Sequence, residues 1–184
     1  MLVSVVIIRI LLMFMACLVL SFSATLAAHQ VIGQIPAETI FVTFVGGTQF
    51  TSALLGMFAL GYQRFDMDIL MGVDLLGSAF YLTGAIVLTV AMNDVPSCDT
   101  TDPISQHSRS INKIISGGCE NDPVNGLQCP YAISANGTDL TMDRCQTAVV
   151  DYSFQYLACI LALAAFGIAY FDRHDQRVEA PFDD

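Results

Sequence analysis

Four separate apolar stretches, each long enough to cross a bilayer, account for most of this chain of 184 residues. A helix needs about 20 apolar residues to span the hydrocarbon core. Lipid offers no hydrogen bonds to the backbone, so such segments must be helical. The pattern predicts an all-α integral membrane protein, a bundle of four spans at approximately Val3–Ala28, Thr39–Gly61, Ile69–Met92 and Ala148–Phe171.

The composition agrees with a membrane protein and argues against a protein that binds nucleic acid. Hydrophobic residues make up 54% of the chain, more than in a typical soluble domain. The 17 acidic side chains against 7 basic ones give a net charge of −10. A chain with so few cations has no basic patch for nucleic acid, so we expect no nucleic-acid partner.

The first apolar stretch has two interpretations. It ends in Thr25-Leu26-Ala27-Ala28, small residues of the kind found at signal-peptide cleavage sites. However, the apolar run is longer than a usual signal-peptide core, and Arg9 comes late in it. We therefore expect a membrane helix, with Arg9 reaching toward the nearer interface.

The few basic residues predict an orientation. Short loops rich in Lys and Arg stay cytoplasmic. The link between the first two spans, His29 to Glu38, has no Lys or Arg. Both termini are then cytoplasmic, and the long loop 93–147 is extracytoplasmic. The expected domains are a four-span unit over 1–171 and an acidic cytoplasmic tail over 172–184. The basic residues that carry this prediction are Arg9, Arg64, Arg173 and Arg177.

Four of the six cysteines, Cys98, Cys119, Cys129 and Cys145, fall in the long loop. An even set in one extramembrane segment is typical of disulfides in an oxidising compartment. Four cysteines allow three pairings; we favour Cys98–Cys145, which would clamp the base of the loop. A zinc site is the alternative, but the loop has no CxxC spacing and only His107 as an imidazole.

Asn136-Gly137-Thr138 is an N-glycosylation triplet, which is meaningful only on the lumenal side of a membrane. Together with the loop cysteines it favours a plasma-membrane or secretory-pathway location.

Each span has one face of small or polar residues. Helices in lipid associate through close packing of small side chains and shared hydrogen bonds, so these faces should meet inside the bundle. The expected packing residues are Ser52 and Gly56 in the second span, Asp74, Ser78 and Tyr81 in the third, and Asp151, Gln155, Ala158 and Ala162 in the fourth.

Two carboxylates lie within spans, where an unpaired charge costs several kcal/mol. Asp74 is near one end of the third span and Asp151 near the opposite end of the fourth, so they cannot pair with each other. The simpler interpretation is that each bonds to neighbouring polar groups. The sharper hypothesis for Asp74 is an ion pair with Arg9.

The long loop contains one expected helix. Asp102 suits an N-cap, Pro103 the first helical position and Gly117-Gly118 the stop. An amphipathic helix over 103–116 follows, with Ile104, Ile111 and Ile115 buried and Arg109 and Lys113 outside. Asp122 to Gly126 reads as a turn.

No phosphate-binding glycine loop, HExxH or GxSxG motif is present in the sequence, and no nucleophile is placed beside a base. We expect no enzymatic activity, no cofactor and no metal.

The layout resembles the MARVEL-domain family, most closely its fungal four-span members. The residues that carry the resemblance are Val6–Ile10 at the start, Asp74–Phe80 in the third span, and Arg144–Gln146 leading through Asp151 and Phe154 into the fourth. Tetraspanins share the topology, but their Cys-Cys-Gly triplet is absent.

The resemblance implies a non-enzymatic membrane organiser that clusters lipids and partner proteins, or copies of itself, through its bundle. The main alternative is an accessory subunit of a larger membrane enzyme or transporter. A weaker third option is a transporter with Asp74 as its coupling group; the sequence shows no broken helices that would favour it.

Overall fold

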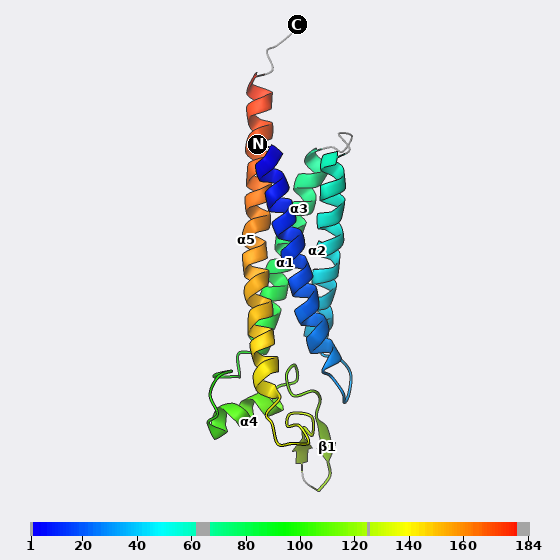
Figure 1. The fold of residues 1–184 in the computed structure, drawn as a ribbon, viewed down its shortest axis with the longest axis vertical. Helices are drawn as coiled ribbons and strands as arrows, with labels where there is room; N and C mark the ends of the chain where they lie inside the picture. The colour runs from blue at the N-terminus through cyan, green and yellow to red at the C-terminus, as the bar shows by residue number, and fades with distance from the viewer. Residues whose placement is uncertain (1, 62–66, 125, 180–184) are drawn as a thin grey trace.

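The computed structural model describes residues 2–61, 67–124 and 126–179. Four long helices lie side by side, and the first and last described residues lie at the end of the bundle opposite the long loop (Figure 1). We call these the terminal end and the loop end. The long helices are α1 (Leu2–Ala28), α2 (Ala37–Gly61), α3 (Met67–Ala91) and α5 (Thr141–Glu179); the loop end adds α4 (Pro103–Ile111), β1 (Glu120–Asp122) and β2 (Gly126–Gln128).

The four-span fold predicted from the sequence is confirmed, since all four long helices are apolar and long enough to cross a bilayer. The last helix differs in length. It begins at Thr141 rather than near residue 148 and continues beyond 171 to Glu179. Its 39 residues span about 58 Å, roughly twice the hydrocarbon core, so the helix is longer than one crossing of a bilayer requires. It starts early because Asp139 Oδ1 accepts the Thr141 N–H at 2.9 Å.

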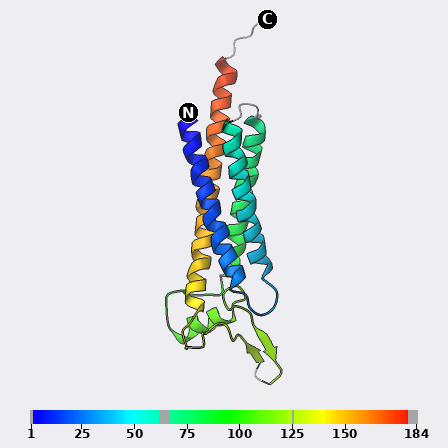
Figure 2. The ribbon, with the colours of Figure 1, turned by 45° about the vertical axis from the view of Figure 1, so that its right-hand side comes forward.

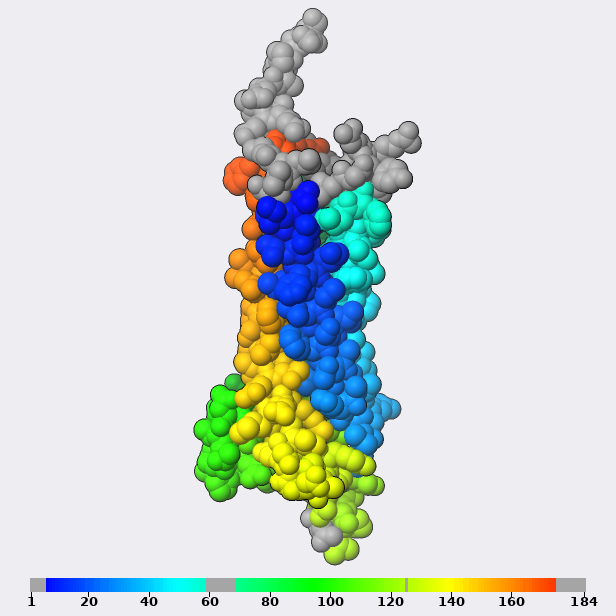
Figure 3. Space-filling model, in the orientation of Figure 1, coloured from blue at the N-terminus to red at the C-terminus, as the bar shows by residue number. Residues whose placement is uncertain are grey.

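The helices form a closed ring in which each packs on two others. Helix α1 packs on α2 and α5, and α3 packs on the same two. The space-filling view shows α1 along one face between α5 and α2 (Figure 3), and the rotated ribbon shows the helices nearly parallel (Figure 2). The segment with signal-peptide features at its end is therefore an integral part of the bundle.

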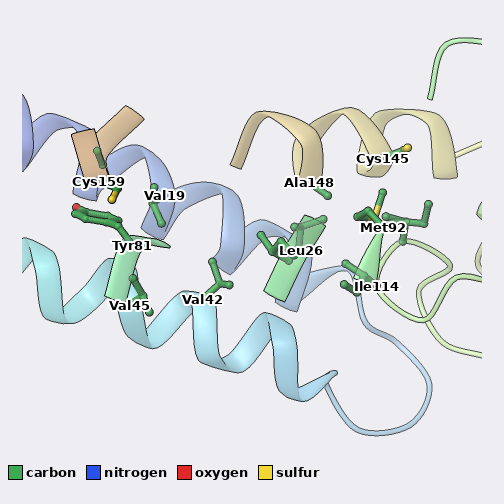
Figure 4. Packing of buried hydrophobic residues seen from close by; sticks show 13 residues of the cluster. Val19, Leu26, Val42, Val45, Tyr81, Met92, Ile114, Cys145, Ala148 and Cys159 are labelled. Carbon is green, nitrogen blue, oxygen red and sulfur yellow. The ribbon is translucent and has the colours of Figure 1, made fainter. Parts of the chain in front are cut away.

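One continuous apolar core joins the bundle to the loop end. Figure 4 shows it passing from Tyr81 beside Cys159, through Val19 and Leu26, toward Ile114. Ile114 belongs to the long loop and is 1% exposed. The long loop therefore packs against the bundle and shares its apolar core.

Gly46 sets the closest approach of α1 and α2. A Cβ at this position would lie 2.8 Å from the backbone nitrogen of Leu20 and 2.9 Å from its Cα. We expect Gly46→Ala to push the two helices apart and lower the free energy of unfolding by about 1–3 kcal/mol, as overpacking does.

Gly47 gives the matched control for this substitution. A Cβ there meets nothing within 4 Å, so Gly47→Ala should leave stability unchanged or raise it by up to about 1 kcal/mol through helix propensity. Unfolding in increasing denaturing detergent, followed by circular dichroism, measures both. Equal effects of the two variants would contradict close packing at Gly46.

We call residues 93–140 the loop domain. Two disulfides brace it: Cys98–Cys145 ties its base to α5, and Cys119–Cys129 closes the segment around the β-hairpin. Strands β1 and β2 pair antiparallel. The turn expected at Asp122 to Gly126 falls between them, and its residue Asn125 lies outside the described part of the chain. The hairpin is the one element type that the all-helical expectation left out.

The expected loop helix is present but shorter and differently oriented. It ends at Ile111, not at residue 116, because the chain turns at Asn112, whose side-chain amide caps α3 through the Ala91 carbonyl at 2.9 Å. Ile104 and Ile111 are exposed, and the buried face is formed by Ser105 and Arg109. The prediction that the isoleucines pack inward and Arg109 points outward is wrong for these residues; Ile115 alone of the three isoleucines is buried.

The link between α1 and α2 docks on the loop domain at two adjacent glycines. The Val31 and Ile32 N–H groups donate to the Gly117 carbonyl at 2.8 and 3.2 Å. Gly117 and Gly118 both have positive φ, and a Cβ at Gly118 would lie 2.2 Å from the Ile32 carbonyl oxygen. Glycine is needed at Gly118 for the conformation and for the contact.

Candidate functional site

Arg9 and Asp74 form a two-pronged ion pair between α1 and α3. Arg9 Nη1 donates to Asp74 Oδ1, and Nη2 donates to Oδ2 at 2.6 Å. Both side chains are 4% exposed. Each charge loses its hydration inside the bundle, so the two charges stabilise one another there. The two parallel hydrogen bonds also fix the orientation of the guanidinium relative to the carboxylate.

Small residues of α2 and α3 make room for long polar side chains next to this pair. Gly56 faces Arg9, where a Cβ would lie 3.4 Å from the guanidinium. Gly77 faces Gln49, where a Cβ would lie 2.6 Å from Oε1. A polar cavity of about 10 Å³, roughly the space of one water, lies among Arg9, Gln49 and Asp74. Gln49 was not singled out from the sequence; its polar character within an apolar span was the available signal.

A second polar cluster lies toward the loop end of the bundle. Asp151 and Gln155 of α5 are both fully buried, and Gln155 Nε2 donates to Asp151 Oδ1 at 3.2 Å. Gly84 of α3 faces Gln155, since a Cβ there would lie 2.2 Å from Oε1. In the described residues Asp151 has no cationic partner, so the two carboxylates within the spans have different environments.

The remaining residues of the expected packing faces line the interior to different degrees. Ser78, Tyr81, Ala158 and Ala162 are buried, and Ser78 Oγ donates to the Leu75 carbonyl of its own helix at 2.7 Å. Ser52 is only half-buried and borders the cavity beside Arg9. Gly56 is buried as well, so these faces are the inner surface of the bundle, with Ser52 at its edge.

Arg109 organises the loop domain from within. Its side chain is fully buried and makes four hydrogen bonds: Nε to Thr141 Oγ1 at 3.2 Å, Nη1 to the Ser97 and Thr100 carbonyls at 2.9 Å each, and Nη2 to Asp139 Oδ2 at 3.0 Å. One side chain thus joins α4, the segment after α3 and the start of α5. Apolar periodicity could not reveal this role.

Two carboxyl groups of the loop domain are held ionised by the fold. Hydrogen bonds from Thr100, and from the backbone and side chain of Ser105, lower the pKa of Asp102 to about 2. Burial raises the pKa of Asp139, but hydrogen bonds from Thr141 and Arg109 outweigh it and leave the pKa below its usual range.

These lowered pKa values predict acid sensitivity confined to the loop domain. The unfolded pKa of Asp is about 3.9, so both groups stabilise the fold above that pH and lose the contribution as pH falls through their lowered folded values. We expect amide hydrogen exchange in α4 to rise below about pH 4 while the bundle stays protected. Asp102→Asn should keep much of the cap and weaken this pH dependence. An unchanged pH profile in that variant would exclude Asp102 as a source.

The structure locates the other sites named from the sequence. Asn136 is exposed in a tight turn in which the Gly137 N–H donates to the Ser134 carbonyl at 2.9 Å. No group of three metal-ligating side chains occurs among the described residues. Arg64 falls outside the part of the chain that the structure describes, as does the end of the tail, 180–184.

Comparison with known proteins returns one family. A family model described as MARVEL, membrane-associating domain, matches residues 2–168, which covers the first three spans, the loop domain and most of the fourth span. No curated protein and no solved structure matches the chain. The match extends over nearly the whole four-helix bundle, so the chain is an integral membrane protein that belongs to the MARVEL family of membrane-associating domains.

Proposed function

We propose that this protein is a non-enzymatic membrane organiser, which clusters lipids and partner proteins, or further copies of itself, through the outer surface of its bundle. The supporting observation is that the inner and outer faces of the spans differ in polarity. Polar side chains such as Arg9, Asp74 and Gln155 are buried. Large apolar ones face outward, including Phe14, Phe44, Leu76 and Ile160.

An outward surface of this kind interacts only with acyl chains or with other membrane helices. The small volume of the cavity inside the bundle also supports the proposal. The cavity beside Arg9 and Asp74 has a volume of about 10 Å³, too small for anything larger than water. The third option, a transporter with Asp74 as its coupling group, is not favoured, because Asp74 is held in an ion pair with Arg9.

Extraction in a gentle detergent, followed by sizing and mass spectrometry, tests the proposal. An organiser gives a spread of self-associated species with retained lipid. The paired variant Phe14→Ala/Phe44→Ala, on the outer faces of α1 and α2, should shift that spread toward monomer by more than twofold. Val124→Ser, an exposed apolar position in the loop domain, serves as the control and should leave it unchanged.

A second candidate, an accessory subunit of a larger membrane enzyme or transporter, is favoured by one observation. The loop domain exposes several apolar side chains, namely Ile104, Ile111, Val124 and Leu127. Under this alternative one partner copurifies in fixed stoichiometry, and Val124→Ser rather than the α1/α2 variant reduces its recovery. That result would replace the organiser proposal.

We further propose that the termini are cytoplasmic, that the loop domain is extracytoplasmic and that residues 172–184 act as an acidic cytoplasmic tail in the plasma membrane or secretory pathway. Asn136 would then be accessible to glycosylation. Treatment with an N-glycosidase should increase the gel mobility of the wild type but not of Asn136→Gln. If the wild type and Asn136→Gln have the same gel mobility before treatment, Asn136 is not glycosylated.

A further inference from the structure

A groove lies at the loop end of the bundle where α2 enters the membrane. It has a volume of about 460 Å³, within the range of small-molecule sites. The α1–α2 link and the start of α2 form one wall, and the loop domain forms the other. The apolar span of α2 begins at Ala37, which lines the groove, so a bilayer around the four spans would place the groove at the level of the lipid headgroups.

The groove presents one charge of each sign. Lys113 Nζ donates to Glu38 Oε1 across it, from the loop domain to α2. The Glu38 side chain is 24% exposed and that of Lys113 is 62% exposed, so both are reachable from the headgroup layer. An exposed pair like this is weak and can exchange partners readily.

Gln30 adds an acceptor that has no donor. Its Nε2 donates to the Ile32 carbonyl at 2.9 Å, which fixes the amide. Its Oε1 is buried and finds no hydrogen-bond partner among the described residues. Gln30 is one of the residues that line the groove. A buried acceptor left without a donor is costly, so the groove favours a ligand that carries N–H groups.

We propose that this groove binds the headgroup of a phosphoethanolamine lipid. The ammonium would donate to Glu38 and Gln30, while the phosphate would accept from Lys113. The headgroup carries one positive and one negative charge. Glu38 would therefore exchange Lys113 for the ammonium, Lys113 would exchange Glu38 for the phosphate, and the net charge of the groove would stay zero. Ile111 and Leu127 line the loop-domain wall, and the exposed Ile40 on α2 continues the apolar surface toward the acyl chains.

Charge and hydrogen-bonding capacity separate this lipid from its competitors. A choline headgroup carries the same charges but no N–H, so it leaves Gln30 Oε1 without a donor. A serine headgroup brings an additional carboxylate to a chain whose net charge is already −10. This inference rests on the proposed role in membrane organisation and names the lipid class for one site.

The test is native mass spectrometry of the full chain released from bilayers of equal phosphatidylethanolamine and phosphatidylcholine. The wild type should retain phosphatidylethanolamine about fivefold over phosphatidylcholine, the effect of an added charge-assisted hydrogen bond at a partly exposed site. Glu38→Gln and Gln30→Leu should each bring that ratio toward one. Lys113→Met should weaken both lipids alike and leave the ratio unchanged, because both carry the phosphate.

Gln146→Leu supplies the control, since this exposed amide bonds to Asp99 at 2.7 Å outside the groove. All variants are first compared with the wild type for disulfide content and size. Equal retention of the two lipids by the wild type, or a preference that survives Glu38→Gln, would overturn the groove assignment. Either result would leave the organiser proposal in place, because that depends on the outer faces of the helices.

Discussion

Replacing Asp74 by Asn while Arg9 is kept is expected to destabilise the bundle by about 3–5 kcal/mol, because it leaves a buried guanidinium without its counter-charge. Both side chains are 4% exposed, so bulk solvent does not reach the guanidinium to offset the lost carboxylate charge. The midpoint of unfolding in increasing denaturing detergent, read by helical circular dichroism, measures the effect.

The same substitution should be tolerated once Arg9 is neutralised. We expect Arg9→Gln/Asp74→Asn to recover most of the lost stability, because removing both charges also removes the cost of burying them. Asp94→Asn, an exposed carboxylate at the loop end, should change stability by less than about 0.5 kcal/mol. Equal damage from Asp74→Asn with and without Arg9 would exclude the pair as the reason.

Arg109→Met is expected to destabilise the loop domain by about 3–5 kcal/mol while leaving the bundle assembled. The substitution keeps much of the side-chain length but removes four hydrogen bonds at once. Asp139 would lose its cation, and the Ser97 and Thr100 carbonyls would lose a donor. Hydrogen exchange should rise across α4 and the first turn of α5.

Lys113 offers the contrast within the same loop domain. Its side chain is 62% exposed and pairs with Glu38, so Lys113→Met should change stability by less than about 1 kcal/mol. Similar effects of Lys113→Met and Arg109→Met would mean that the buried contacts of Arg109 are not what holds the loop domain together.

The membrane architecture could be predicted because the bilayer imposes a length and a polarity that the sequence must display. Each span shows about 20 apolar residues in a row, and the inward faces show as small or polar residues. Asp74 and Arg9 are charges in apolar surroundings at the same end of the bundle, so an attractive contact between them could be inferred from the sequence. The structure contains that contact.

The ends of α5 could not be predicted from hydropathy, which falls where the helix leaves the lipid although the helix continues. Thr141 begins the helix because of a cap from Asp139, a local interaction with no apolar signal. At the other end the helix passes beyond the span through polar residues to Glu179.

The orientation of α4 was predicted wrongly because it was inferred from the isoleucine pattern. In a short helix a buried face is decided by the available partners as well as by apolar area. Arg109 has four acceptors beneath it, supplied by segments far away in sequence, whereas Ile104 has no such surface and is 75% exposed. The disulfide-braced loop domain positions these acceptors, and the spacing of apolar residues along the sequence gives no information about them.

The glycines opposite polar side chains give a similar lesson. Gly56, Gly77 and Gly84 face Arg9, Gln49 and Gln155, each from a neighbouring helix. The sequence shows which positions are small, but only the helix register shows which large side chain each of them accommodates. Of the three polar residues, Arg9 and Gln155 were singled out from the sequence and Gln49 was not.

The most direct test of this account is the accessibility of two engineered thiols in sealed microsomes whose cytosolic face is outward. In a background of Cys17→Ala/Cys159→Ala, the four remaining cysteines are paired in the two disulfides. A membrane-impermeant maleimide should label His174→Cys at once and Asn136→Cys only after detergent is added. Labelling of Asn136→Cys in intact microsomes would place the loop domain in the cytosol and contradict the proposed orientation, in which the termini are cytoplasmic and the loop domain is extracytoplasmic.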